Sequence, residues 1–350
     1  MKKLAKTAKL RGLHIRSYVL LLVTIMFLMP GLAALSACRQ NPRNLTEITF
    51  ALDWTPNTNH SGLFLARDLG YFAEEGLNVS LQQSDMTFIE QVGSGAAQFG
   101  IASQEQVLQA RAASGKVPVV AVAAVIQHNT SGFASPVDRK IVVPKDFMGK
   151  TYSGWGTPLE EAFIRTLVEA DGGDYSKVKI INQSATDFFA ALETEADFVW
   201  IYKGWDGVAA EVNNYPLNFI LLQEIDPQLD FYSPVIIANE SVVREQPELV
   251  RRFLRAATRG YMKAIEEPAA AVQALLAEAP ELDAELLEKS QNYLNTQYIA
   301  DALRWGEMTK QRWDDFAVWM DDRGLLESKI AVDDAWTAEF LPEWKADGQK

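Results

Sequence analysis

The chain has 350 residues, 48% of them apolar, and this length fits about two domains with buried cores. Its formal net charge of −13 argues against a nucleic-acid partner, because such a partner needs a basic face. The single cysteine excludes a disulfide scaffold or a cysteine-cluster metal site, and the three histidines lack metal-ligand spacing. Phosphate-binding glycine motifs are also absent. We therefore expect neither a metal nor a cofactor.

The first 37 residues are typical of an export signal. Six basic residues and no acidic ones precede an apolar run over 18–29, and small residues follow up to Ala37. The sequence Leu35-Ser36-Ala37-Cys38 fits a lipobox, in which the thiol of Cys38 carries a diacylglyceryl group. We expect a polar tether over 38–45 and a lipid anchor on the extracytoplasmic face of the cell membrane. The alternatives are an uncleaved transmembrane anchor and a lone cysteine without a role.

From residue 46 onward, short apolar strands alternate with helical patterns, which favours βαβ units and mostly parallel sheets. We expect strands over 48–54, 77–81, 99–103, 118–126, 151–153, 178–181, 198–202, 218–222 and 231–239. Between them we expect helices over 60–69, 87–92, 104–113, 158–170, 187–192 and 207–212. After residue 240 the pattern is helical only, with helices over 247–265, 270–277, 282–290 and 310–323.

Two long apolar strands, 118–126 and 231–239, bracket the second of two similar α/β series. This arrangement predicts an α/β protein of two lobes joined by two crossover strands. A ligand cleft would lie between the lobes, at the ends of the strands. The expected first lobe contains 46–127 and 232–325, the second contains 128–231, and 326–350 form a C-terminal tail.

The segment ITFALDWTPNTNHSGLFLARDLGY over Ile48–Tyr71 contains a specific D-W-T-P-N-x-x-H block, and the paired G-W segments Gly154-Trp155-Gly156 and Gly204-Trp205, the latter preceded by Trp200, are specific as well. Together these segments resemble the thiamine-pyrimidine-precursor binding and synthase family, over about residues 46–325. The resemblance implies the fold of a type II periplasmic binding protein. The family contains enzymes that build a pyrimidine from pyridoxal phosphate and a protein histidine, and bacterial solute-binding proteins of ABC importers.

The sequence departs from the enzymes of this family at the residues that carry their chemistry. The resemblance places the cofactor lysine and the sacrificial histidine at positions that hold Ala102 and Gln106 here, and no Lys or His occurs over 99–108. The cysteine cluster of the enzymes, expected near 230–239, is absent too. Without an amine, a Schiff base with pyridoxal phosphate cannot form. We therefore expect a binding protein and not an enzyme.

The first group of candidate ligand contacts follows the first strand. Trp54 offers an indole that stacks well on a heteroaromatic ring, with Asp53 as a neighbouring polar contact, although an ordinary core Trp is the alternative. Asn57, Asn59 and His60, at the start of the next helix, are candidates for contacts with polar atoms of a ligand. The alternatives are that Asn59 or Ser61 caps that helix and that His60 is a hydrogen-bonded structural residue.

The second group lies mainly in the second series of strands and helices. Trp155 stands between two glycines, where an indole is difficult to explain as a core residue. Glu160 either contacts the ligand or closes a capping box with Thr157. The remaining candidates lie at strand ends or crossings: Gln104, Tyr202, Trp205 and Tyr232.

These aromatic and amide side chains favour a planar, nitrogen-rich, uncharged ring as the ligand. Relatives that bind pyrimidine precursors have a carboxylate near 198–203, where this chain has Tyr202-Lys203. We therefore expect riboflavin, with a thiamine pyrimidine precursor as the alternative. A vitamin-biosynthesis enzyme and a sulfonate or nitrate binder are further alternatives, and the latter would need Arg or Lys in the cleft. The expected partners of this monomer are an ABC permease and its ATPase.

Overall fold

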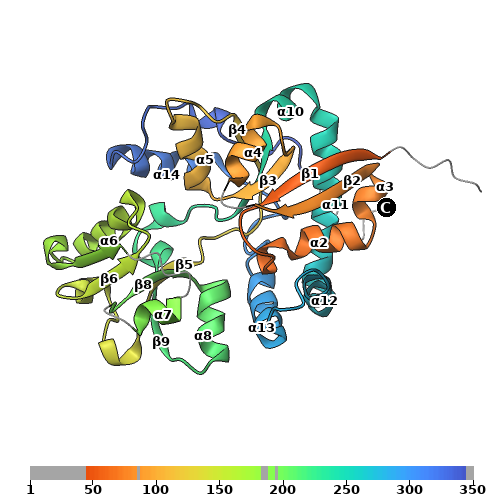
Figure 1. The fold of residues 1–350 in the computed structure, drawn as a ribbon. Helices are drawn as coiled ribbons and strands as arrows, with labels where there is room; N and C mark the ends of the chain where they lie inside the picture. The colour runs from red at the N-terminus through yellow and green to blue at the C-terminus, as the bar shows by residue number, and fades with distance from the viewer. Residues whose placement is uncertain (1–44, 85–86, 183–187, 194–195, 344–350) are drawn as a thin grey trace, which may run out of the picture. The chain divides into compact units, whose positions relative to one another are not determined.

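The computed structural model describes residues 45–84, 87–182, 188–193 and 196–343 (Figure 1). The export signal, Cys38 and the tether up to residue 44 lie outside the described residues, so the lipid anchor stays a prediction. Among the helices in the described ranges, none combines the length and the apolar character needed to span a bilayer.

The first sheet contains five strands in the order β2-β1-β3-β10-β4, and we call this sheet and its helices lobe I. The strand bounds are Thr46–Leu52 (β1), Leu77–Gln83 (β2), Phe99–Ala102 (β3), Val119–Ala124 (β4) and Val235–Asn239 (β10). β1 pairs in parallel with β2 and β3, whereas β10 is antiparallel to both of its neighbours. Every residue of β4 and β10 is buried, as their unbroken apolar sequences predict.

Two smaller sheets, β8-β5-β9 and β6-β7, form what we call lobe II together with their helices. The strand bounds are Ser131–Pro136 (β5), Thr151–Gly154 (β6), Lys179–Asn182 (β7), Val199–Tyr202 (β8) and Leu217–Leu221 (β9). Only β6 and β7 pair in parallel, while β5 is antiparallel to β8 and β9. The expectation of mostly parallel sheets is therefore wrong. The chain enters lobe II at β5 and returns to lobe I at β10, and each of these strands is antiparallel to its neighbours.

Strand β5 was not predicted, since its sequence Ser-Gly-Phe-Ala-Ser-Pro contains no apolar run. Small residues are nevertheless required there, because β5 lies between two other strands. A Cβ atom at Gly132 would come within 2.3 Å of the carbonyl oxygen of Ile220 on β9. Glycine thus marks a close approach of two backbones that a hydrophobicity pattern does not reveal.

Helices cover the sheets of both lobes. In lobe I they are Ser61–Asp68 (α2), Tyr71–Glu74 (α3), Phe88–Ser94 (α4) and Gln104–Ala112 (α5). In lobe II they are Pro158–Ala170 (α6), Phe188–Leu192 (α7), Val208–Val212 (α8) and Leu222–Ile225 (α9). The C-terminal helices are Glu240–Glu245 (α10), Pro247–Glu266 (α11), Pro268–Glu278 (α12), Ala284–Asn295 (α13) and Lys310–Asp322 (α14). A π-helical turn, Lys203–Gly207 (η5), follows β8, and 3-10 turns lie at Thr58–His60 (η1), Val137–Arg139 (η2), Pro144–Phe147 (η3), Tyr175–Lys177 (η4), Pro227–Leu229 (η6) and Val332–Asp334 (η7).

The long amphipathic helix α11 packs against both the sheet of lobe I and α2 (Figure 1). Phe253 stacks on Phe99 of β3, with ring centroids 4.1 Å apart. Where α11 crosses α2, a Cβ atom at Gly260 would lie 1.9 Å from the carbonyl oxygen of Gly62. The two helices therefore approach backbone to backbone, and this crossing fixes α2 against the sheet.

The chain passes between the lobes from β4 to β5 and again from β9 to β10. β10 begins at Val235, later than the expected strand 231–239, since Pro234 has no amide hydrogen to donate to a ladder. Phe231 instead stacks on Phe316 of α14, with ring centroids 4.3 Å apart. The amide of Val125 donates to the carbonyl of Pro234 at 2.9 Å, which joins the two crossings.

The C-terminal segment up to residue 343, which we expected to be part of a tail, packs against the outer side of β4. Ala121 donates its amide hydrogen to the carbonyl of Ala335 at 2.9 Å and accepts one from Thr337 at 2.8 Å. The ring of Trp336 lies parallel to that of Trp313 in α14, with centroids 6.1 Å apart. The segment thus extends the sheet of lobe I at its β4 edge.

Candidate functional site

The loop after β1 is held by a buried histidine. His60 is fully buried, and its Nε2 lies 2.9 Å from Oδ1 of Asp53. The amide of Asn57 donates to Nδ1 of His60 at 3.2 Å, so Nε2 carries the hydrogen that is donated to Asp53. Both ring nitrogens are therefore used inside the protein. His60 positions the Asp53 carboxylate, which keeps 27% of its side-chain surface exposed.

Asn57 acts as the cap of the turn η1. Its Oδ1 accepts from the amide of Asn59 at 2.9 Å, and its Nδ2 donates to the carbonyl of Thr55 at 3.0 Å. The carbonyl of Asn59 accepts from the hydroxyl of Tyr261 on α11 at 2.7 Å. The expected cap was Asn59 or Ser61, but the side chain that caps the turn is that of Asn57. These hydrogen bonds hold the loop that follows Trp54.

Trp54 follows β1, and 47% of its surface is exposed. Its ring lies edge-on to that of Trp205 in η5, with centroids 6.3 Å apart and planes at 80°. Ser290 of α13 holds the two loops together, since its Oγ lies 2.6 Å from Oγ1 of Thr58 and also donates to the carbonyl of Gly204. The ends of β1 in lobe I and β8 in lobe II thus meet at two aromatic residues.

Glu105 is the one charged residue between Phe99 and Leu108, and the sequence analysis did not select it. It lies in the first turn of α5 and is 5% exposed. Oε1 accepts a hydrogen bond from the hydroxyl of Ser103, whereas Oε2 is buried and has no partner from another residue in the described ranges. Burial raises the pKa of Glu105 to about 7, and the hydrogen bond from Ser103 acts in the opposite direction.

Tyr202, at the end of β8, contacts Ser233, whose neighbour Tyr232 is hydrogen-bonded to Gln104, the residue before Glu105. Burial raises the pKa of the Tyr202 hydroxyl well above its usual value, and the negative charge of Glu105 is the next cause. The hydroxyl lies 3.3 Å from Oγ of Ser233, just before β10. The charge of Asp53 also acts on Tyr202. The structure therefore brings together Asp53, Trp54, Glu105, Tyr202 and Trp205, which we call the strand-end group.

Trp155 and Glu160 lie in the loop between β6 and α6. Glu160 is 1% exposed and closes the loop, because Oε1 accepts from the amide of Trp155 at 3.1 Å and Oε2 from that of Thr157 at 3.0 Å. This is the capping box that we gave as the alternative for Glu160. Trp155 is 63% exposed, and none of the ring contacts found among the described residues involves it. Its indole is exposed to solvent on a loop that the hydrogen bonds to Glu160 close.

Gln104 and Tyr232 lie inside the fold and are 0% and 1% exposed. The amide of Gln104 donates to the carbonyl of Tyr232 at 2.9 Å, and that of Tyr232 donates to Oε1 of Gln104 at 2.9 Å. The Tyr232 hydroxyl accepts from the amide of Thr309 at 3.0 Å, and the guanidinium of Arg312 lies over its ring. These contacts attach the second crossing to α5 and α14.

A charged cluster lies where the crossings enter lobe II. Nδ1 of His128 is 2.7 Å from Oδ2 of Asp230, and Nε2 is 2.9 Å from Oδ1 of Asp301. The guanidinium of Arg312 also contacts Asp230, at 3.0 Å. The hydrogen bond with Asp230 is the main reason that the pKa of His128 is raised, and burial and Arg312 oppose it. The cluster joins both crossings to α14 and to the loop before it.

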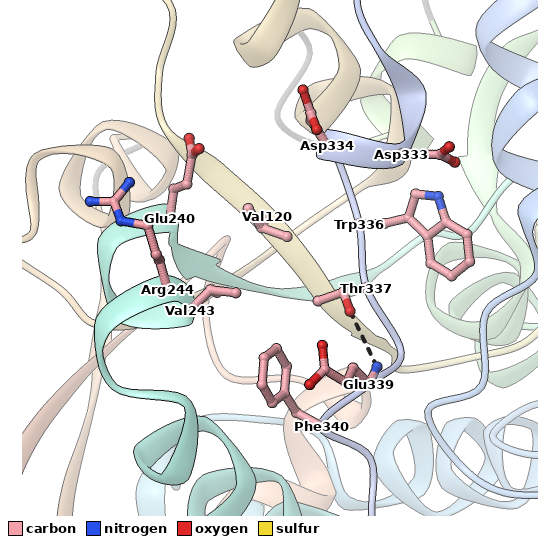
Figure 2. Close-up of a pocket in the computed structure, with 10 residues that line it drawn as sticks. All are labelled: Val120, Glu240, Val243, Arg244, Asp333, Asp334, Trp336, Thr337, Glu339 and Phe340. Atoms are coloured by element: carbon pink, nitrogen blue, oxygen red, sulfur yellow. Dashed lines mark hydrogen bonds between the residues drawn. The ribbon is translucent and has the colours of Figure 1, made fainter.

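The pocket in Figure 2 has a volume of about 340 Å³ and lies away from the strand-end group. It is lined by residues of β4, α10 and the C-terminal segment, of which Glu240, Asp333, Asp334 and Glu339 are acidic. A second pocket, of about 590 Å³, lies beside α8 and β9 and includes Lys203 and Phe219. Within the described residues, no group of three or more His, Cys, Asp or Glu side chains is arranged to hold a metal ion.

Residues 57–271, more than half of the chain, match the sequence profile of the NMT1/THI5-like family. The chain belongs to this family. A formylaminopyrimidine-binding protein of Halalkalibacterium halodurans is 28% identical over 336 residues, covering 90% of this NMT1/THI5-like chain and 98% of the relative. The riboflavin-binding protein RibY of Chloroflexus aurantiacus is 26% identical over 357 residues, covering 95% and 98%. A 4-amino-5-hydroxymethyl-2-methylpyrimidine phosphate synthase of Legionella pneumophila is 24% identical over 311 residues, covering 85% and 93%.

Solved structures confirm the predicted fold class of this NMT1/THI5-like protein. The periplasmic sulfonate-binding protein SsuA of Methylobacillus flagellatus has a TM-score of 0.65 at 16% identity, covering 85% of this chain and 93% of that protein. The aliphatic sulphonate-binding protein SsuA of Escherichia coli has a TM-score of 0.65 at 12% identity, covering 87% and 96%. The fold is that of a type II periplasmic binding protein, and the family resemblance read from the sequence is confirmed as well.

Proposed function

We propose that this protein is the extracytoplasmic solute-binding component of an ABC importer and that it captures a planar heteroaromatic vitamin, with riboflavin as the first candidate. The observation that carries the proposal is the meeting of Trp54 and Trp205 at the ends of β1 and β8. Indole rings provide flat apolar area on which a heteroaromatic ring stacks favourably. The isoalloxazine ring of riboflavin is long enough to contact more than one of them.

A thiamine pyrimidine precursor is the second candidate, and a specific observation favours it. The sequence argued against an aminopyrimidine because Tyr202-Lys203 occupies the stretch where relatives that bind pyrimidine precursors have a carboxylate. Carboxyl groups are nevertheless found at the end of β8. Asp206 accepts from the amide of Tyr202 at 3.3 Å, and the charge of Glu105, on α5, acts on the Tyr202 hydroxyl. The similarity to a formylaminopyrimidine-binding protein supports the same candidate.

The side chains at the expected positions of the synthase chemistry support binding without conversion. Ala102 is buried in β3 and has no functional group. Gln106 uses Oε1 to accept from the amide of Ser103 at 3.0 Å, as part of the capping box of α5. Neither side chain can form a Schiff base or act as an imidazole donor. We therefore propose a carrier in place of the synthase activity of some relatives.

In the proposed cycle, an open form admits the vitamin, the two lobes close on it, and a membrane permease with its ATPase recognises the closed form. The crossings of residues 125–130 and 222–234 would serve as the hinge. A lipid on Cys38 would keep this monomer at the extracytoplasmic face of the cell membrane. Loss of membrane retention in a Cys38→Ala variant is the result that this anchor requires.

The proposal is tested by titrating the purified protein with riboflavin, followed by quenching of flavin fluorescence, and with formylaminopyrimidine and hydroxymethylpyrimidine in a calorimeter. The absorbance and mass spectrum of any molecule that co-purifies provide an independent readout. Saturable binding of an unchanged ligand supports the carrier. Formation of a pyrimidine from pyridoxal phosphate by the purified protein would instead establish an enzyme.

A further inference from the structure

Glu105 presents a carboxyl oxygen that the rest of the protein leaves without a hydrogen-bond donor. Its side chain is 5% exposed, and within the described residues no other residue donates to Oε2. Oε1 is satisfied by the hydroxyl of Ser103. A buried carboxyl oxygen without a donor is unfavourable, and proteins usually retain such a group where a ligand or a reaction uses it.

Among the described residues, those around Glu105 provide hydrogen-bond acceptors but no positively charged side chain. Neither an arginine nor a lysine contributes to the electrostatic environment found for Glu105, and the salt bridges of the described residues do not include it. On the side of Tyr202, the tyrosine hydroxyl is engaged with Ser233 at 3.3 Å. Asp53 and Asp206 also act on Tyr202; Asp53 already accepts from His60, and Asp206 accepts from the amide of Tyr202 at 3.3 Å. Within the described residues, no other residue donates to Oε2, which leaves this oxygen available to a donor on a ligand.

The position of Glu105 ties this oxygen to the proposed binding function. Glu105 follows β3, the parallel neighbour of β1, and Trp54 follows β1. Gln104, the neighbour of Glu105, accepts from the amide of Tyr232, next to Ser233, which contacts the Tyr202 hydroxyl three residues before Trp205. A ring that stacks on these indoles places its polar edge at the level of the strand ends. The edge of a flat heteroaromatic vitamin carries N–H donors beside the ring plane, whereas its faces carry none.

We infer that Glu105 is a specificity-determining residue, and that its Oε2 accepts a hydrogen bond from a ring N–H or ring amino group of the ligand. This inference rests on the proposed function. Two ligands share the required chemistry, because riboflavin has the N3–H of its uracil-like edge and an aminopyrimidine has its exocyclic amino group. An analogue that lacks the donor would leave the carboxyl oxygen buried and unpaired, which is a strong basis for rejection.

The inference is tested with Glu105→Leu, which removes the acceptor in a site that is already buried, and with Glu105→Gln, which keeps an acceptor and removes the charge. Glu90→Gln is the matched control, since Glu90 lies in the first turn of α4 in the same lobe and is exposed. Thermal melting verifies that each variant folds. We expect Glu105→Leu to raise the Kd for the ligand by about 10- to 100-fold and Glu90→Gln to leave it unchanged.

Methylated ligands show which donor is recognised. N3-methylriboflavin lacks the N3–H, and a pyrimidine with a dimethylamino group lacks the amino donor. We expect the wild-type protein to lose affinity for the methylated form of its own ligand and Glu105→Leu to bind the two forms equally. If folded Glu105→Leu binds the parent ligand as tightly as the wild type, the role of Glu105 is refuted while the carrier function stands. If the wild type binds neither riboflavin nor the aminopyrimidines, the proposed function fails first.

Discussion

The indole of Trp54 meets the indole of Trp205 edge to face, at 6.3 Å between ring centroids. One belongs to the loop after β1 in lobe I and the other to η5 after β8 in lobe II, so the contact links two segments that are distant in sequence. Trp54 retains 47% of its surface for a further partner. This aromatic contact between the lobes leaves part of the Trp54 ring exposed, and a flat ring of a ligand can stack there.

Replacing Trp54 or Trp155 by alanine should weaken ligand binding by about 1–3 kcal/mol each, the scale of a lost aromatic stack. Both indoles are exposed to solvent, so these substitutions should change the melting temperature little. Leu303→Ala is the control, since Leu303 is an exposed apolar residue outside the strand-end group. The measurement is the dissociation constant of the ligand for the wild type, the two tryptophan variants and the control. If both tryptophan variants bind the ligand as tightly as the wild type, neither tryptophan is part of the binding site.

Glu105 should make the protein less stable as the pH rises. Its pKa is about 7 in the folded state, against 4.5 as the ordinary value, so the folded state holds the proton more tightly. The stabilisation by this proton is fully present below 4.5 and is lost as the pH rises through 7, up to a limit of about 3 kcal/mol. Glu105→Gln should therefore raise the free energy of unfolding most clearly near pH 8. Denaturant titrations at several pH values measure the difference, and parallel curves for the two proteins would contradict the prediction.

His128 should contribute stability at low pH. Because Asp230 raises its pKa, the contribution is present below the ordinary value of 6.5 and is lost as the pH rises through the folded-state value. A His128→Gln variant should be less stable than the wild type near pH 5, and the two should converge near pH 9. Glu105 also lowers the stability of the protein as the pH rises. The comparison therefore uses the difference in the free energy of unfolding between variant and wild type at each pH. A constant difference would mean that His128 acts through packing alone.

Gly260→Ala should destabilise the protein by about 3 kcal/mol or more, because the added Cβ would lie 1.9 Å from the carbonyl of Gly62 and must force α11 and α2 apart. Gly115→Ala is a matched control, since a Cβ at Gly115 meets no atom within 4 Å. Melting temperatures of the two variants provide the measurement. A small effect at Gly260 would show that the helix crossing is not tightly packed.

The sequence predicted many of the elements because apolar periodicity is a local property. The helix expected over 247–265 is α11, Pro247–Glu266, and the strand expected over 118–126 contains β4. The directions of β5 and β10 were not predictable in this way, since they depend on how the chain crosses between lobes. β5 also lacked a local signal, because contact with β9 requires small residues there.

The candidate site was predicted only in part. Trp54 and Trp205 were selected as flat aromatic residues at strand ends, and the structure brings them together. Glu160 and His60 were selected as polar residues, and their side-chain atoms are used by their own loops. Glu105 was missed because a charged residue in the first turn of a helix usually faces solvent. α5 is tied to the second crossing by the hydrogen bonds between Gln104 and Tyr232, and no local pattern reports the burial of Glu105.

The segment 335–337 has a consequence for solubility that its place at the end of the chain does not suggest. β4 is the last strand of its sheet, and its amide and carbonyl groups at Ala121 are satisfied by Ala335 and Thr337. An uncovered strand of this apolar character is a template for pairing between molecules. A chain shortened before Ala331 would expose that template, and self-association would then compete with delivery of the solute.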